Sequence, residues 1–176
     1  MKRFLFSIFL FPNLIFGQTL FTLEIKGKPE NTVINKLSYK KSFPSKTERD
    51  KEIQNVLFHL YDNAYLTASI DSSNTDSLKK IVFVKVGEQY KWTTLRKGNA
   101  DEGILSMVGY KEKFFSGKPF YYKEAGKLQK KILTYCENNG YPFASVKLDS
   151  ILIAETTLSA TINLQKNNLI KIDSVV

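Results

Sequence analysis

The sequence contains two similar seven-residue stretches, NAYLTAS at residues 63–69 and NGYPFAS at residues 139–145. The Tyr, Ala and Ser match at a fixed separation of 76 residues, from Tyr65 to Tyr141. A separation of this size is typical of one supersecondary unit that occurs twice in tandem. The segments around the two stretches should then show the same order of helices and strands.

In the residues before the first stretch, apolar and polar side chains first alternate, and the apolar side chains then recur at helical spacing. Residues 19–26 alternate between apolar and polar side chains, which predicts a half-buried strand. Asn31 can cap a short helix, and Ser45 with Glu48 forms the capping box of a longer helix. The apolar stripe of that longer helix consists of Ile53, Val56, Leu57 and Leu60.

Two more strands are predicted after this helix. Residues 65–71 form the first of them, residues 72–76 form a turn, and residues 80–86 form the returning strand. The returning strand is apolar on both faces, which favours a place in the middle of a sheet.

The same order is predicted again in the second half. Residues 90–95 form a strand, and Asn99 with Glu102 can cap a short helix. Residues 142–153 and 157–164 form the two final strands. Between them and the short helix lies a longer helix, whose apolar side consists of Ala125, Leu128, Ile132, Tyr135 and Cys136.

These patterns predict an α+β protein made of two βααββ units, over residues 18–88 and 89–166. Residues 167–176 are expected to be the first strand of a further, truncated unit, so we expect the sequence to be the N-terminal part of a longer protein.

Residues 1–17 are expected to be a secretory signal peptide. Lys2 and Arg3 precede an apolar run at residues 4–16, and Gly17 offers a small residue before Gln18. An uncleaved membrane anchor is the alternative, but a spanning helix needs about 20 apolar residues. The chain is therefore expected to be exported.

Net charge and cysteine content limit the possible binding partners and the cellular setting of the chain. The net charge is +9, to which Lys2 and Arg3 contribute two, and the remaining lysines are scattered along the chain. Nucleic acid, anionic lipid headgroups and an acidic protein remain open from charge alone, although export disfavours nucleic acid and a generally solvated basic surface is preferred. The single Cys136 cannot form an internal disulfide, so a bacterial envelope fits better than a disulfide-rich secreted scaffold. Its register predicts a buried thiol.

Residues for enzymatic chemistry are missing from the sequence. His59 and Cys136 are single residues of their type, and no Gly-x-Ser-x-Gly, phosphate-binding Gly loop or Cys/His metal spacing occurs. We therefore expect no catalytic residue, no cofactor and no metal.

The segments 18–27, 137–144 and 148–151 resemble POTRA domains of the BamA/TamA outer-membrane-protein superfamily, especially versions from Bacteroidetes. In that family a helix ends in Gly-Tyr, a strand follows at once, and an Ala lies three residues beyond the Tyr. Gly140, Tyr141 and Ala144 match this pattern. The first copy has Ala64 in place of the Gly.

The resemblance implies the fold and the setting. Each unit would be a three-stranded mixed sheet covered by two helices, with its second strand at an open edge. The chain would lie in the periplasm, tethered to the outer membrane by a C-terminal barrel that is absent from this sequence. Its partners would be unfolded or nascent outer-membrane polypeptides, or envelope assembly partners.

The resulting functional hypothesis is that the chain is the polypeptide-binding region of an outer-membrane protein assembly or insertion factor. An extended client or partner chain would pair with an open strand edge, because such an edge offers unpaired N–H and C=O groups. The alternative is an envelope scaffold, or the periplasmic region of a polypeptide-secretion transporter, that docks a fixed partner. The residues expected at the two binding edges are Tyr65, Thr67, Ser69, Asp71, Phe143, Ser145, Val146, Lys147 and Asp149.

Overall fold

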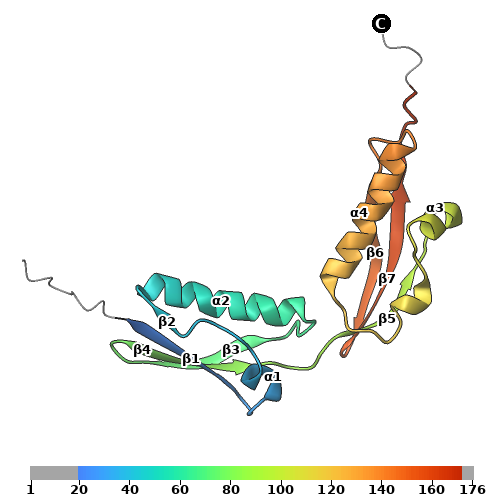
Figure 1. Cartoon of the computed structure of the whole chain (residues 1–176). Coiled ribbons are helices and arrows are strands. Elements are labelled where there is room, and N and C mark those ends of the chain that lie inside the picture. Colours follow the sequence, from blue (N-terminus) through green and yellow to red (C-terminus); the bar gives the residue numbers. More distant parts are fainter. Residues whose placement is uncertain (1–19, 172–176) are drawn as a thin grey trace, which may run out of the picture.

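The computed structural model describes residues 20–171, which form two sheets, each with its own helices (Figure 1). The predicted signal peptide at residues 1–17 lies outside the described residues. Among residues 20–171, no helix has the length and apolar character needed to cross a membrane.

The first unit is a mixed sheet with one long helix along a face (Figure 1). Its elements are β1 (Phe21–Gly27), α1 (Thr32–Asn35), β2 (Ser42–Phe43), α2 (Lys46–Asp62), β3 (Ser69–Thr75) and β4 (Lys79–Lys85). The strand order is β2-β1-β4-β3, with β4 parallel to β1 and antiparallel to β3. The two-residue β2 adds a fourth strand to the three that were expected.

The predicted start signals explain the helices of this unit. The Asn31 side chain accepts a hydrogen bond from the Val33 amide at 2.8 Å, and the Ser45 hydroxyl accepts one from the Glu48 amide at 3.2 Å. Each bond satisfies an amide that has no partner inside its helix. The α2 stripe then packs on the sheet, and the buried core of the unit is Leu23, Ile25, Ile34, Phe43, Ile53, Val56, Leu57, Leu60, Ala68, Val82, Val84 and Val86.

The second unit repeats this plan. Its elements are β5 (Lys91–Arg96), α3 (Glu102–Met107), η1 (Glu112–Phe114), α4 (Tyr122–Asn138), β6 (Ser145–Ala154) and β7 (Thr157–Gln165). The strand order is β5-β7-β6, with β7 parallel to β5 and antiparallel to β6. Cys136 is buried, as its register predicted. The core packs around Trp92, Leu95, Ile132, Cys136 and Ile162, all at most 1% exposed.

The matching stretches fold alike. The Tyr65 amide donates to the Leu60 carbonyl at 3.0 Å, and the Tyr141 amide donates to the Cys136 carbonyl at 2.9 Å. The residue before each Tyr is left-handed, with φ of 69° at Ala64 and 85° at Gly140. This backbone state closes the carboxyl end of a helix. The repeat seen in the sequence is therefore a repeated helix-to-strand turn.

This turn makes the predicted strand starts wrong. The Ala68 amide donates to the Tyr65 carbonyl at 3.1 Å, and the Ala144 amide donates to the Tyr141 carbonyl at 3.2 Å. Six residues therefore separate each helix from the next strand, at 63–68 and 139–144, and β3 and β6 begin only afterwards. The turn expected at residues 72–76 was also wrong, because residues 72–75 pair with β4.

Two further expectations need correction. Asp101, not Asn99, caps α3, because its carboxylate accepts from the Gly103 amide at 2.8 Å. The Asn99 side chain instead bonds both backbone groups of Leu164. Residues 167–171, the described part of the expected third-unit strand, form no strand, and residues 172–176 lie outside the described residues.

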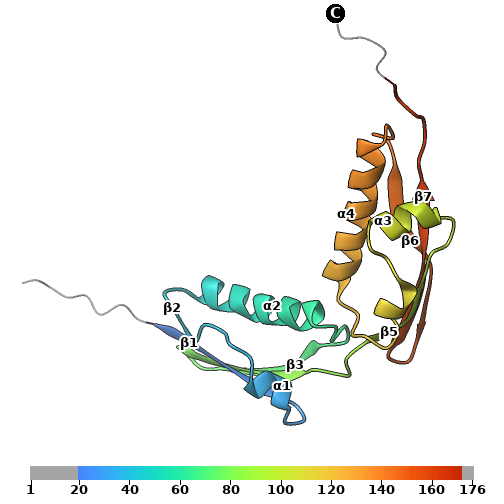
Figure 2. The same ribbon diagram turned by 45° about the vertical axis from the view of Figure 1, so that its right-hand side comes forward.

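The two units are joined end to end in a bent arrangement (Figures 1 and 2). At the bend, the Tyr90 amide donates to the Ala64 carbonyl at 2.8 Å, and Lys123 of α4 pairs with Asp62 of α2. The chain leaving the second unit is held in the same way, since the Ile170 amide donates to the Gly140 carbonyl at 2.8 Å.

Candidate functional site

Each sheet has two edges, and in the first sheet the β1 side is covered by the chain itself. The free side of β1 is closed by β2 and by the segment before it. The Leu23 amide donates to the Lys41 carbonyl at 2.9 Å, and the Ile25 amide donates to the Tyr39 hydroxyl at 2.9 Å. The edge of β1 therefore offers little to another chain.

The second sheet is closed on the matching side. The Trp92 amide of β5 donates to the Lys118 carbonyl at 2.8 Å, and the Gly117 amide donates to the Trp92 carbonyl at 2.8 Å. Residues 117–120 therefore cover β5, although they belong to no strand.

The opposite edges, β3 and β6, are open. Among residues 20–171, neither strand has a backbone partner on its outer side, and β3 is exposed along its whole length. The strand orders β2-β1-β4-β3 and β5-β7-β6 place β3 and β6 at the ends of their sheets. Open edges of this kind accept an extended peptide as an additional strand.

The direction of the outer amides in β3 follows from its neighbour. The Val84 carbonyl accepts from the Lys28 amide at 2.9 Å, so the backbone groups of Val84 point toward β1. Backbone direction alternates along a strand, so the β3 residues opposite Val84 and Val82 point outward. These residues are Ile70 and Ser73. Asp71 lies at a register shift between them, so the usable edge divides at this bulge.

The same reasoning orients β6. Both backbone groups of Leu164 on β7 bond to Asn99, on the side away from β6. The β6 residues opposite Leu164, Ile162 and Leu158 therefore present their amides and carbonyls to solvent. They are Val146, Leu148 and Ile153. A second register shift lies between Asp149 and Leu152, where Ser150 has a φ of 49°.

The structure places the predicted edge residues unevenly. Six of them lie on the open strands, and three lie in the turns that precede those strands. Tyr65 is half-buried against the core, Thr67 packs beside Gly87, and the Phe143 carbonyl accepts from the Asn167 side chain at 2.6 Å. The six on strands are Ser69, Asp71, Ser145, Val146, Lys147 and Asp149.

Two parts of the edges were missed from the sequence. The polar run at residues 72–75 has the composition of a turn, and only its pairing with β4 makes it a strand. The apolar run at residues 151–153 was included in a strand but not in the site. In the structure these three residues are 52%, 65% and 61% exposed, which is unusual for Ile and Leu and marks this part of the edge.

Aromatic and charged side chains flank the open strands. Phe58 of α2 is 60% exposed and packs edge-on to Tyr61, whose hydroxyl donates to the Ala68 carbonyl directly before β3. Lys28 lowers the pKa of the Asp71 carboxyl through a hydrogen bond. The Asn163 amide, followed by the Ser150 amide, lowers the pKa of the Asp149 carboxyl. Each carboxylate is also paired with a lysine, Asp71 with Lys28 at 2.7 Å and Asp149 with Lys147 at 3.5 Å, so the charges at the two edges are largely balanced.

No group of three His, Cys, Asp or Glu that could hold a metal lies among residues 20–171. The candidate site therefore consists of the two open strand edges, β3 and β6.

Comparison with solved structures places this geometry in a known fold. The chain matches the structure of BamA from Haemophilus ducreyi lacking POTRA domains 1–3, with a TM-score of 0.53 and 14% identity over 84% of the chain. Both units have the POTRA fold. The fold expected from the sequence is thereby confirmed, and at this identity the likeness concerns the fold alone. The chain spans 29% of the length of that BamA chain.

Two further matches are to POTRA structures. POTRA domains 3–5 of Haemophilus influenzae BamA match with a TM-score of 0.48 and 15% identity, over 87% of this chain and 69% of that one. POTRA domains 1–2 of Omp85 from Anabaena match with a TM-score of 0.47 and 11% identity, over 86% of this chain and 96% of that one. No family model and no curated protein matches the sequence.

Proposed function

We propose that this tandem POTRA chain is the periplasmic, polypeptide-binding region of an outer-membrane protein assembly or insertion factor, and that it acts without enzymatic chemistry. Extended client or partner segments would add as strands to β3 and β6. The observation that supports this most directly is the difference between the edges, since β1 and β5 are covered by the chain and β3 and β6 are not.

Backbone pairing would give a weak and sequence-tolerant grip. A net hydrogen bond contributes about 0.5–1.5 kcal/mol, and Val146 and Leu148 together offer two amides and two carbonyls on one uninterrupted part of β6. Four such bonds supply about 4 kcal/mol, which corresponds to a Kd of about 1 mM before ordering costs. Side-chain contacts must therefore add to the binding.

The apolar end of β6 can supply those contacts. Ile151, Leu152 and Ile153 are exposed beside the outward amide of Ile153. Covering one such side chain fully contributes about 1.5–3 kcal/mol. The β6 edge is therefore the stronger candidate for apolar clients, and the polar β3 edge the weaker one.

The test is removal of single outward amides. Ile153→Pro and Ser73→Pro each remove one outer donor and spare the bonds within the sheet. Proline at Ser69 or Ser145 would not serve, because these residues point toward the neighbouring strand and proline would break the sheet itself. The matched controls are Ile153→Ser and Ser73→Ala, which keep the amide.

The client is a fluorescently labelled outer-membrane porin diluted from urea, and binding is measured by anisotropy. Each Pro variant should bind about fivefold more weakly than its control, as expected for one lost hydrogen bond. Circular dichroism verifies that the variants are folded. Folded Pro variants that bind as well as their controls would exclude strand addition at these edges.

A further inference from the structure

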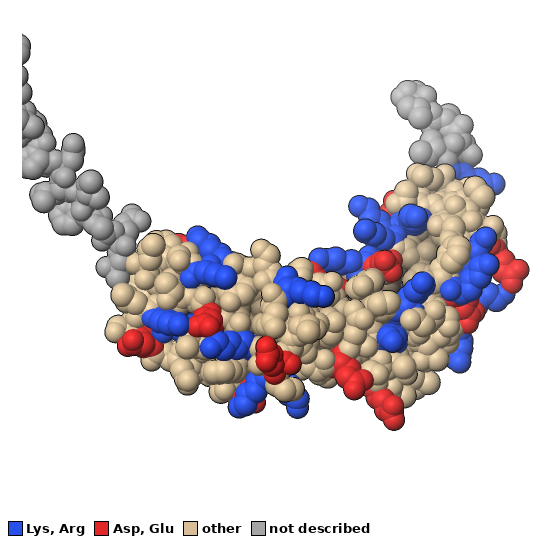
Figure 3. Space-filling view, turned by 60° about the horizontal axis from the view of Figure 1, so that its bottom comes forward, with Lys and Arg blue, Asp and Glu red and all other residues tan. Residues whose placement is uncertain are grey.

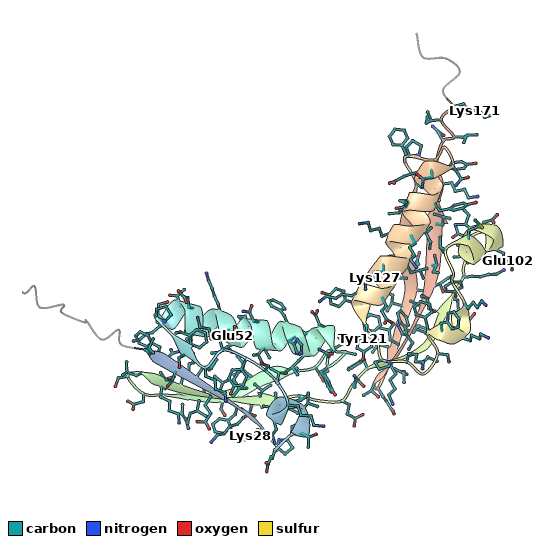
Figure 4. The ribbon with its side chains drawn as sticks, in the orientation of Figure 1. Lys28, Glu52, Glu102, Tyr121, Lys127 and Lys171 are labelled. Atoms are coloured by element: carbon teal, nitrogen blue, oxygen red, sulfur yellow. The ribbon has the colours of Figure 1, made fainter. Side chains whose placement is uncertain are left out.

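A second candidate surface lies on the helical side of the second unit. The end of α3 and the length of α4 enclose a groove of about 540 Å³, which continues into a hollow of about 300 Å³ beside η1. Both are lined by Val108, Lys127 and Lys131. Figure 4 labels Lys127 near the start of α4. The groove uses none of the outward groups of β3 or β6.

The floor of this groove is apolar. Met107 is 72% exposed and Phe114 is 56% exposed, and Val108 and Tyr135 lie partly buried beside them. Large apolar side chains gathered in an exposed hollow are typical of a binding surface. A flexible Met side chain adapts well to differently shaped partners.

The rim of the groove carries three lysines and, at the hollow beside η1, the acidic Glu124. Lys127, Lys130 and Lys131 are exposed, and within residues 20–171 none of the three forms an ion pair. Their spacings of three and four residues bring like charges together on one helix, which destabilises it. Figure 3 shows Lys and Arg side chains gathered over the second unit. A bound anionic group would relieve this repulsion.

The first unit serves as an internal comparison. At the repeat separation of 76 residues, the counterparts of Lys127, Lys130 and Lys131 are Lys51, Gln54 and Asn55. The fold therefore does not need three lysines at these positions, and the basic rim is a property of the second unit alone.

We propose that the α3–α4 groove binds an acidic segment of a partner protein that also carries large apolar side chains. Its carboxylates would pair with the lysine rim, and its apolar side chains would cover Met107 and Phe114. From Glu124 to Asn138 the groove follows α4 for about 21 Å, at 1.5 Å per residue. That length accommodates about six extended residues or four helical turns. Charge beside an apolar floor matches an amphipathic segment better than a nucleic acid, whose phosphates offer no apolar side.

The probe is a labelled helical peptide of about 14 residues with Glu along one face and Leu along the other. One control peptide has Gln in place of Glu, and another has Ser in place of Leu. Anionic phosphatidylglycerol vesicles form a separate arm. Binding to the purified chain is measured by anisotropy and, for vesicles, by flotation.

The Glu/Leu peptide should bind, and both control peptides should bind at least about tenfold more weakly. Lys127→Glu with Lys131→Glu should weaken binding at least about tenfold, and Met107→Ser should weaken it severalfold. The matched control Lys51→Glu on α2 should change nothing. Fluorescence of the buried Trp92 verifies that each variant is folded. If the double Lys→Glu variant unfolds, Lys127→Gln with Lys131→Gln is used in its place.

Three results would overturn the proposal. The first is absence of peptide binding. The second is equal binding of the Glu/Ser peptide, which charge alone would explain, or binding that the lysine and Met107 variants leave unchanged, which would mean that the peptide binds elsewhere. The third is lysine-dependent vesicle binding without peptide binding, which would assign the surface to a membrane.

Discussion

Gly140→Ala should destabilise the second unit, because this residue closes α4 in a left-handed conformation. Its φ is 85°, and a Cβ atom there would lie 2.8 Å from Leu169 Cδ1 and 3.1 Å from the Ile170 carbonyl oxygen. A left-handed Ala costs about 1–2 kcal/mol relative to a right-handed one. The methyl group reduces the entropy of the unfolded chain, which returns about 0.4–1 kcal/mol. The crowding against Ile170 adds to the cost.

The expected net loss is about 1–2 kcal/mol in the free energy of unfolding. Trp92 measures this loss selectively, because it is the single Trp of the chain and lies 1% exposed in the second unit. Its fluorescence in a urea titration therefore follows the unit that contains the substitution. For a small domain, the midpoint should fall by about 1 M urea.

Gly126→Ala is the matched control in the same unit. Gly126 lies within α4, and a Cβ there would meet nothing within 4 Å. The same chemical change should therefore raise the free energy of unfolding by about 0.5–1 kcal/mol, because Ala favours the helix. The reasoning fails if Gly140→Ala leaves the midpoint unchanged or raises it, or if both variants shift it in the same direction.

Three further outcomes are expected. Ala64→Gly should change the free energy of unfolding of the first unit by less than about 1 kcal/mol, because relief of the left-handed strain is offset by the lost buried methyl group and by backbone entropy. Circular dichroism in a urea titration measures this change. A loss of about 2 kcal/mol or more would contradict the prediction. Arg49→Met should leave the free energy of unfolding unchanged or raise it, because Arg49 is 2% exposed and its Nη1 has no partner among residues 20–171. Arg49→Ala should be less stable than both Arg49→Met and the unchanged protein. The reverse order would be inconsistent with a poorly paired buried charge. The hydrogen bond from Lys123 holds the pKa of Asp62 below its usual 3.8, so the Lys123–Asp62 pair is complete above about pH 4 and is lost as the pH falls through the lowered pKa. Small-angle scattering should distinguish Asp62→Asn from the unchanged protein at about pH 6, and the difference should shrink as the pH is lowered. A difference that does not depend on pH would argue against this contact.

The element order was predictable from the sequence because it depends on local periodicity and capping. The stripe from Ile53 to Leu60 and the caps at Asn31 and Ser45 contain their own physical signal, and the structure confirms them. Repetition of the Tyr-containing stretch predicted two units, and the two separate sheets confirm them.

The strand starts and the covered edges could not be predicted by the same means. The turn after each helix depends on hydrogen bonds to the last helical turn, and the short segment from Ala64 to Ala68 resembles a strand in composition. Coverage of β5 by residues 117–120 depends on long-range contacts that leave no periodic pattern. The sequence therefore placed six of the nine proposed edge residues on the open strands and three in the turns that precede them.

The anchored link at Tyr90 has a consequence for long clients. Because the Tyr90 amide is bonded to Ala64 and Lys123 is paired with Asp62, the two units are joined by more than a loose tether. If both edges bind clients as proposed, a polypeptide already paired with one edge would meet the other as an intramolecular event, at an effective concentration in the millimolar range for a short link. Two contacts that are each too weak to retain a client can then act together, and release begins by detaching either one. Chain length, in addition to apolar side chains, would thus become a criterion for selecting which clients are held.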